Sequence, residues 1–272
     1  MIENPANFHQ LDGRLRLRGV LTFQTALHVG AGKATDEATD LPVLRDAQGH
    51  PFLPGASIKG VLRSTLESLV RSASEKSTGF WACDPLVDKP NKLAAGLELA
   101  CGVHEPGKRS GVDIRQHCTL CQIFGSRVLA SHVRVSDALI RDRDQRPPIE
   151  LRDGVAIDRD RRVVYGGQKY DFEVVAPGTQ FNLEVFVENP QPWMMGLLTI
   201  GFDQIADGFT TLGGFSSRGL GRATLEWTDV LEFSAAQLLA GNDPESLKDK
   251  KLETRQKEWR AALAAKVPGK RS

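Results

Sequence analysis

An alternating stretch near the N-terminus limits the fold most strongly. Between residues 14 and 29, apolar side chains occupy most odd positions and polar side chains most even positions, His28 among them. A period of two is that of a β-strand with one face on a core and the other in water. We therefore expect residues 14–29 to form a strand, which ends in the glycine-rich sequence 30–32.

A second periodic segment follows at 54–70 and predicts a helix. Its buried stripe has the three-and-four spacing of an amphipathic helix and consists of Ile58, Val61, Leu62, Thr65, Leu66, Leu69 and Val70. Ser57 is the expected N-cap. Lys59 and Arg63 are four residues apart, so we expect them together on the opposite, solvent-facing side.

The remaining periodic segments complete an α+β core. Alternation returns around 133–135 and at 181–187, a core helix is expected at 193–205, and a last strand starts at 223. The order strand, helix, strands, strand, helix, strand is that of a split βαβ, ferredoxin-like core. It divides the chain into a first core half (1–77), an insertion built around something other than a core (78–126), a second core half (127–232) and a helical tail (233–272).

Composition excludes several classes of protein. The 272 residues are 40% hydrophobic and 25% charged, which is typical of a globular chain. With 35 Lys and Arg against 34 acidic residues, any nucleic-acid surface must be local. The longest nearly apolar stretch, 193–202, is about half of the ~20 residues that a membrane helix needs. No secretion signal is visible, and we expect a cytoplasmic chain without a membrane partner.

The four cysteines fall within 39 residues of the insertion. Structural disulfides are not expected in a reducing compartment. The CxxC spacing of the last pair suits a tetrahedral zinc ion, and the other two cysteines would complete a structural site. Scattered buried thiols are the alternative, and His104 or His117 could replace a cysteine. The expected ligands are Cys83, Cys101, Cys118 and Cys121.

Two segments are candidates for binding phosphate. The loop at 211–221 contains Gly213 and Gly214 and, with the next residue, two arginines, Arg218 and Arg222, and no acid. Glycines let backbone N–H groups approach a phosphate, and arginines can donate two hydrogen bonds to it. A structural tight turn is the alternative. The second candidate is the start of the 54–70 helix, with its basic pair and its free N–H groups.

For catalysis, the polar stretch after the first strand holds an acidic cluster of Asp36, Glu37 and Asp40. A carboxylate there could orient a 2′-hydroxyl or hold a divalent cation. Solvated loop acids are the simpler interpretation. His28 could act as a general base, although a single histidine usually does not.

Four segments together resemble one family. They are LHVGAG (27–32), TDLPVLRDAQGHPFLPGASIKGVLRS (39–64), CQIFGS (121–126) and LGGFSSRGLGRATL (212–225). These segments look like the RAMP superfamily, and within it most like the backbone subunits of type III CRISPR effector complexes. The resemblance runs from about residue 14 to residue 230.

The resemblance implies a modified RRM-like fold whose copies or paralogues stack along a guide RNA. A protruding thumb, expected at about 141–175, would separate bases, with Tyr165 or Val164 as the wedge. The basic residues of the first helix and the glycine-rich loop would bind the guide. Many such subunits cut paired target RNA with magnesium or another divalent cation and a loop aspartate. That position falls on Asp40, with Asp36 as the fallback.

Three alternatives stay open from the sequence. One is a guide-binding scaffold without catalysis. Another is a ribonuclease that processes the guide precursor, with His28 as general base. The last is a zinc-dependent RNA-binding protein that uses no guide.

Overall fold

A computed structural model describes residues 10–32, 39–73, 76–89, 94, 97–103 and 114–268. The strands are β1 (Gly13–Phe23), β2 (Phe52–Leu53), β3 (Val133–Val135), β4 (Ala138–Ile140), β5 (Ile149–Ile157), β6 (Val164–Val175), β7 (Gln180–Glu188), β8 (Ala223–Ser234) and β9 (Glu245–Ser246). The α-helices are α1 (Gly55–Ala73), α2 (Thr119–Phe124), α3 (Pro192–Ala206), α4 (Ala235–Leu239) and α5 (Lys250–Lys266). Single 3-10 turns lie at Lys76–Thr78, Ile114–Gln116 and Ser216–Arg218.

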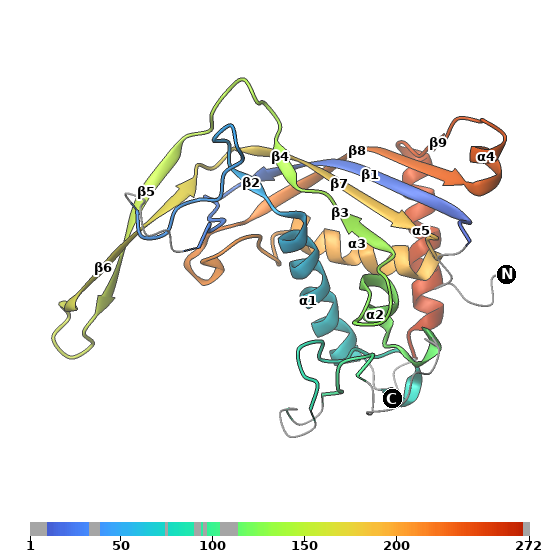
Figure 1. The fold of residues 1–272 in the computed structure, drawn as a ribbon, viewed down its shortest axis with the longest axis horizontal. Coiled ribbons are helices and arrows are strands. Elements are labelled where there is room, and N and C mark those ends of the chain that lie inside the picture. The colour runs from blue at the N-terminus through green and yellow to red at the C-terminus, as the bar shows by residue number, and fades with distance from the viewer. Residues whose placement is uncertain are drawn as a thin grey trace.

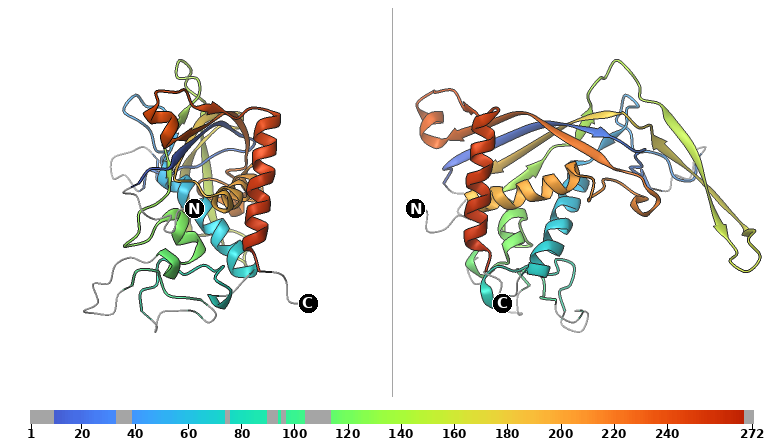
Figure 2. Two further views of the ribbon diagram at one scale, coloured as in Figure 1. Left: turned by 90° about the vertical axis from the view of Figure 1, so that its right-hand side faces the viewer. Right: turned by 180° about the vertical axis from the view of Figure 1, so that it is seen from behind.

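Within these residues, seven strands form one antiparallel sheet, which confirms the α+β class. Its order is β2-β4-β7-β1-β8-β9, and β3 also pairs with β7. The central strand β1 therefore lies between β7 and β8, which are far from it in sequence. Helices α1, α2, α3 and α5 all lie on one side of the sheet (Figures 1 and 2).

The inner face of β1 explains its alternation. Leu15, Leu17, Leu21 and Phe23 are all buried against the helical layer. The ring of Phe23 meets that of Phe181 on β7 edge-on, with 5.6 Å between centroids. The expected strand was too long, because β1 ends at Phe23 and residues 26–30 continue it only as isolated bridges.

Helix α1 begins at Gly55, three residues before the start that Ser57 as N-cap would give. Its first N–H group donates to Oδ1 of Asp137 at 2.7 Å, so a distant residue takes the capping role expected of Ser57. A side chain at position 55 would meet the carbonyl oxygen of Val135 at 2.1 Å, which explains the glycine. The helix buries Ile58, Leu62, Leu66 and Val70 as predicted, whereas Leu69 is 41% exposed.

The outer face of the sheet has no helix over it in the described part of the chain (Figure 1). The polar side chains of β1 project there and pair with acids on both neighbouring strands. The pairs are Arg14–Glu188 at 3.1 Å, Arg16–Asp229 at 3.4 Å and Arg18–Glu184 at 2.7 Å.

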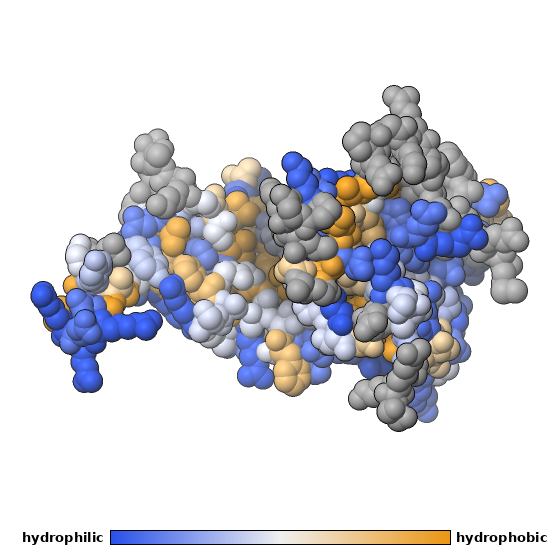
Figure 3. Space-filling model, turned by 90° about the horizontal axis from the view of Figure 1, so that it is seen from below, coloured by the Kyte–Doolittle hydropathy of each residue, from blue (hydrophilic) through white to orange (hydrophobic). Residues whose placement is uncertain are grey.

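Strands β5 and β6 form a separate two-stranded sheet that projects from the body as an arm (Figure 1). The two strands pair from Ile149–Val175 outward to Ile157–Val164. Tyr165 is 58% exposed and Val164 47% exposed. Seen from below, the tip of the arm is largely hydrophilic, with apolar surface nearer the body (Figure 3).

The 78–126 insertion is partly a core element, which corrects the expectation from its composition. Helix α2 buries Leu120, Ile123 and Phe124, and these side chains join the main hydrophobic cluster. Phe80 and Trp81 are buried in the same cluster. Among the described helices, none combines the length and apolarity needed to cross a membrane.

Candidate functional site

The segment 26–30, directly after β1, lies between the glycine-rich loop and the base of the arm. Leu27 pairs with Val175 at the end of β6, and His28 pairs with Gly214. Gly30 pairs with Val43 in the loop that contains Asp40. This short segment therefore brings three candidate regions together that are far apart in the sequence.

His28 is buried, so the expectation of a solvent-facing side chain was wrong. Only 6% of the residue is exposed. Its Nδ1 atom lies 2.8 Å from the carbonyl oxygen of Glu173. The rings of Phe215 and Phe172 pack on it, with centroids at 4.9 Å and 6.0 Å. The alternation failed here because the chain leaves the sheet before residue 28.

The glycine-rich loop uses much of its backbone within the fold. The N–H group of Gly214 donates to the carbonyl of His28 at 2.8 Å, and that of Gly221 donates to Ala26 at 2.9 Å. Gly213 has φ +87°, and a Cβ there would lie 2.4 Å from the carbonyl oxygen of His28. These glycines therefore let the loop pack closely against segment 26–30. That is the structural role that the tight-turn alternative gives them.

The arginines of the loop are exposed. The guanidinium of Arg218 lies 4.7 Å from the centre of the Phe215 ring and donates to the hydroxyl of Tyr170. Arg222 is held through its backbone, whose N–H group donates to Thr25 Oγ1 at 3.0 Å. Its side chain is exposed. Planar guanidinium groups in such positions suit bidentate binding of phosphate.

Asp40 lies at the surface, hydrogen-bonded to the base of the arm. Its N–H group donates to Oδ1 of Asp171 at 2.7 Å, and the N–H of Asp171 donates to Oδ2 of Asp40 at 3.1 Å. Leu41 pairs with Phe172 as a parallel bridge. The fallback residue Asp36, like Glu37, lies outside the described residues.

Sequence reasoning missed the residues that hold this site together. Tyr170, Asp171, Phe172 and Glu173 are consecutive on β6, and we call them the arm root. Tyr170 contacts Arg218, and Asp171 contacts Asp40. Phe172 and Glu173 both contact His28. Four consecutive strand residues span about 10 Å, so the three candidate side chains share one neighbourhood. The alternating aromatic and acidic pattern was the available signal.

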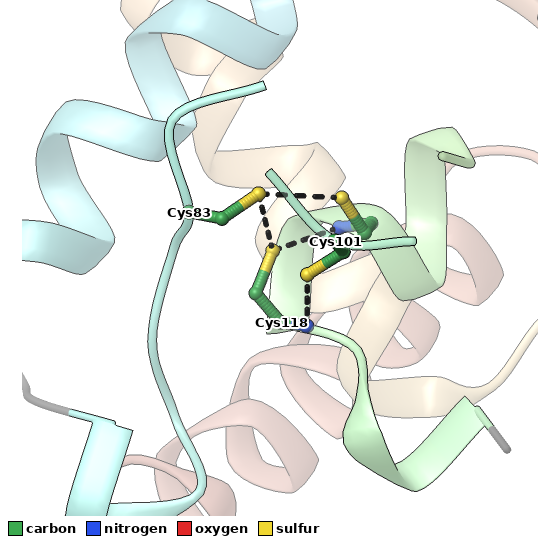
Figure 4. A group of neighbouring side chains, drawn as sticks. Cys83, Cys101 and Cys118 are labelled. Carbon is green, nitrogen blue, oxygen red and sulfur yellow. Dashed lines mark hydrogen bonds between the residues drawn. The ribbon is translucent and has the colours of Figure 1, made fainter. Parts of the chain in front are cut away.

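The four cysteines form a compact cluster (Figure 4) beside α1, where Arg63 contacts Cys121 and Arg71 contacts Cys83. Their four Sγ atoms all lie within 4.8 Å of one another. The Cys83 Sγ is 3.6 Å from the Sγ atoms of both Cys118 and Cys121. These separations far exceed the ~2.05 Å of a disulfide bond, and all four cysteines are free. The cluster can hold a metal ion.

Crowding among the thiols shifts their pKa values in opposite directions. Hydrogen bonds from Cys101 and from the other two cysteines lower the pKa of Cys118. The pKa of Cys83 falls to about 7, with the Cys101 hydrogen bond as the main cause. The hydrogen bond with Cys118 is the main cause that raises the pKa of Cys101, and the hydrogen bond with Cys101 is the main cause that raises the pKa of Cys121. A bound cation would let all four act as thiolates, the form that ligates metals.

Of the two histidine alternatives, His117 does not join the cluster among the described residues. The Nε2 atom of His117 lies 3.1 Å from the hydroxyl of Ser126. His104 lies outside the described residues.

Lys59 and Arg63 do not face solvent as expected, but lie half-buried against α2 and the segment after it. Arg63 donates to Glu67 at 2.7 Å, to the Gly125 carbonyl at 3.1 Å and to the Cys121 Sγ at 3.3 Å. Lys59 donates to the Ser131 hydroxyl at 2.8 Å, and burial together with the nearby Arg63 charge lowers its pKa. The helical spacing placed the pair correctly on one face, but α2 and the segment after it cover that face.

Comparison with known proteins bears on the same regions. Residues 20–224 match the RAMP superfamily, a span that includes the end of β1, the cysteine cluster, the arm and the glycine-rich loop. The chain belongs to the RAMP superfamily.

Two relatives are each named CRISPR system Cms endoribonuclease Csm3. The protein from Methanocaldococcus jannaschii is 27% identical over 226 residues, which cover 78% of each chain. The protein from Enterococcus italicus is 43% identical over 56 residues, which cover 20% of this chain and 26% of the relative. The first similarity extends over most of this RAMP chain, and the second is local.

Proposed function

We propose that this RAMP protein is a guide-RNA-binding backbone subunit of a type III CRISPR effector complex, and that it cleaves complementary target RNA. The observation that carries the proposal is the similarity, over 226 residues, to a protein named as a CRISPR-system endoribonuclease. Its partners would be the guide RNA, the target RNA and other RAMP-type subunits or copies of itself. The strand order β4-β7-β1-β8 supports a split βαβ, RRM-like core for this role.

Cleavage would start from attack by a target 2′-hydroxyl on the adjacent phosphate. The O2′–P bond forms, the P–O5′ bond breaks, and the products are a 2′,3′-cyclic phosphate and a 5′-hydroxyl. Asp40 would orient the nucleophile or hold a divalent cation. Magnesium suits oxygen ligands such as this exposed carboxylate, and when bound it would stabilise charge on the phosphate.

The arm and the glycine-rich loop would position the RNA. Tyr165 and Val164 are exposed near the tip of the arm, as a wedge between bases requires. Arg218 and Arg222 have exposed side chains that can meet guide phosphates, whereas Gly213 and Gly214 shape the loop. Lys59 and Arg63 stay predicted guide contacts, although their present hydrogen bonds are with the protein itself.

The cysteine cluster would hold a structural zinc ion. A tetrahedral site with Zn–S bonds of about 2.3 Å places its sulfurs about 3.8 Å apart. The measured separations of 3.6 Å from Cys83 to Cys118 and to Cys121 agree with that geometry. All four positions would be filled by protein, so the ion would stabilise the insertion without taking part in cleavage.

A cleavage assay on labelled RNA complementary to the guide tests the proposal. The complex is assembled with native or Asp40→Ala protein and supplied with Mg²⁺ or EDTA. We expect regularly spaced cuts that are lost in both controls, with the Asp40→Ala rate lower by at least ~100-fold. Target that is bound but uncut by the native complex would leave the chain a scaffold.

The other open alternatives make different predictions. A guide-precursor ribonuclease would cut a repeat hairpin in isolation and without metal. The burial of His28 under two aromatic rings does not favour it as a general base for a large RNA substrate. An RNA-binding protein that uses no guide would copurify with RNA of random sequence.

A further inference from the structure

The arm root makes hydrogen bonds with both the backbone and the side chain of Asp40. From this geometry we infer that Asp171 is a positioning residue, which holds the Asp40 carboxylate in place for target cleavage. This inference rests on the proposed role of Asp40. Asp171 itself is assigned no contact with the substrate.

The two aspartates bind one another reciprocally. The Asp171 carboxylate accepts the backbone N–H of Asp40 at 2.7 Å, while the Asp40 carboxylate accepts the N–H of Asp171 at 3.1 Å. Asp40 is exposed, so packing does not restrict its side chain. Hydrogen bonds must therefore supply the order that burial supplies elsewhere. The backbone N–H of Asp171 holds the Asp40 carboxylate directly, and the Asp171 carboxylate fixes the Asp40 backbone from which that side chain extends.

Glu173 of the arm root also binds the loop of Asp40, but through residues 41–45 and not through Asp40 itself. The N–H of Glu173 donates to the Leu41 carbonyl at 3.0 Å. The Glu173 carboxylate accepts from the N–H of Val43 at 2.9 Å and from Arg45 at 2.8 Å. These bonds keep residues 41–45 on β6 when Asp171 is changed. A variant at 171 should therefore disturb Asp40 without detaching the loop.

Two conservative substitutions separate positioning from a need for negative charge. Asp171→Asn keeps an acceptor oxygen in the same place and removes the charge. Asp171→Glu keeps the charge and moves the acceptor by one C–C bond, about 1.5 Å. Displacements of that order in a catalytic group can lower a rate by ~100-fold. Positioning through the hydrogen bond therefore predicts that Asn is tolerated better than Glu.

The experiment uses the assembled complex with native protein or with Asp171→Asn, Asp171→Glu, Asp171→Ala or Asp40→Ala. Single-turnover cleavage and target affinity are measured for each. We expect Asp171→Ala and Asp171→Glu to cut at least ~10-fold more slowly with target affinity within twofold, and Asp171→Asn within threefold of native. Asp46→Ala is the matched control, because its carboxylate also accepts backbone N–H groups, from Gln48 and His50. It should cut within twofold of the native rate.

The outcomes are distinguishable. A native rate for Asp171→Glu together with a slow Asp171→Asn would overturn the inference, because charge and not placement would then matter. A native rate for both Asp171→Ala and Asp171→Glu, with Asp40→Ala inactive, would also overturn it while leaving the proposed function intact. A native rate for Asp40→Ala would overturn both. If Asp171→Ala fails to assemble, the order of the Asn and Glu variants decides.

Discussion

The arm root and the cysteine cluster both gather side chains from distant segments, but they do so by different means. At the arm root, backbone hydrogen bonds and aromatic rings hold Asp40 and Arg218 at an exposed surface. In the cysteine cluster, four thiols and Arg63 meet one another in a largely buried centre. An open group of carboxylate, guanidinium and rings can meet a large ligand, whereas a closed set of thiols can only stabilise its surroundings.

The largest effect should come from breaking the closed centre. Cys118→Ser removes the thiol that contacts Cys83 Sγ and accepts the N–H of Cys121. We expect the free energy of unfolding to fall by roughly 3 kcal/mol or more, because metal binding and folding of such a segment are coupled. Urea unfolding and metal analysis of the purified protein measure this, with about one zinc per native chain expected.

A chelator provides the control for that variant. It should destabilise the native protein and increase hydrogen exchange in α2, yet add little to the effect of Cys118→Ser. Equal stability of the native protein with and without chelator would show that the cluster needs no metal, and the contrast with the arm root would then disappear.

A smaller loss of unfolding free energy is expected for Arg63→Met, a variant that separates a structural role of Arg63 from a role in RNA binding. Arg63→Met leaves buried Glu67 with Arg71 alone, at 3.3 Å, and removes the bonds to Gly125 and Cys121. We expect a loss of about 2 kcal/mol in unfolding free energy. Lys59→Met, which loses one bond to Ser131, should lose less than about 1 kcal/mol.

Thermal unfolding of both variants and guide affinity of the assembled complex are the measurements. A stable Arg63→Met protein with weakened guide binding would move Arg63 from the closed centre to the RNA surface. That result would support the proposed guide contact of Arg63 over a role in the closed centre.

The smallest effect should come from Tyr170→Phe in the arm root. The substitution removes the hydroxyl that accepts from Arg218 and keeps the ring 5.8 Å from its guanidinium. We expect guide affinity to fall by about twofold to fivefold, equivalent to ~0.5–1 kcal/mol, with stability unchanged. Thr228→Val on β8, which removes an exposed hydroxyl that donates to the Arg18 carbonyl at 3.2 Å, is the matched control. An unchanged affinity for Tyr170→Phe would show that the rings alone order Arg218.

Local patterns predicted the elements well. The alternation of β1 and β7 and the stripe of α1 follow from burial of one face, which a single segment reveals. The nearly apolar sequence of α3 predicted a core helix, and its residues from Met194 to Thr199 are all buried. The CxxC spacing likewise led to a cluster that the structure assembles. In these cases the signal lies within a few neighbouring residues.

The errors came where a distant segment decides. Lys59 and Arg63 are on a polar face of α1, but α2 and the segment that follows it cover that face. His28 continues the alternation of β1, yet the chain leaves the sheet and the arm root covers the ring. The cap on Gly55 comes from Asp137, 82 positions away. The arm root escaped notice because its partners lie 48 to 145 positions away.

The ion pairs on the outer sheet face bear on how a polyanion would approach the molecule. Each arginine of β1 is matched by an acid on a neighbouring strand within 3.4 Å. Such exposed pairs add little stability. Each pair has no net charge, so its field falls off faster than that of a single arginine, and salt screens what remains beyond about 8 Å. The three arginines therefore do not attract a polyanion such as RNA to the outer face of the sheet from a distance. Reversing one acid, as in Glu184→Lys, would create a basic patch and a competing landing point on the outer face.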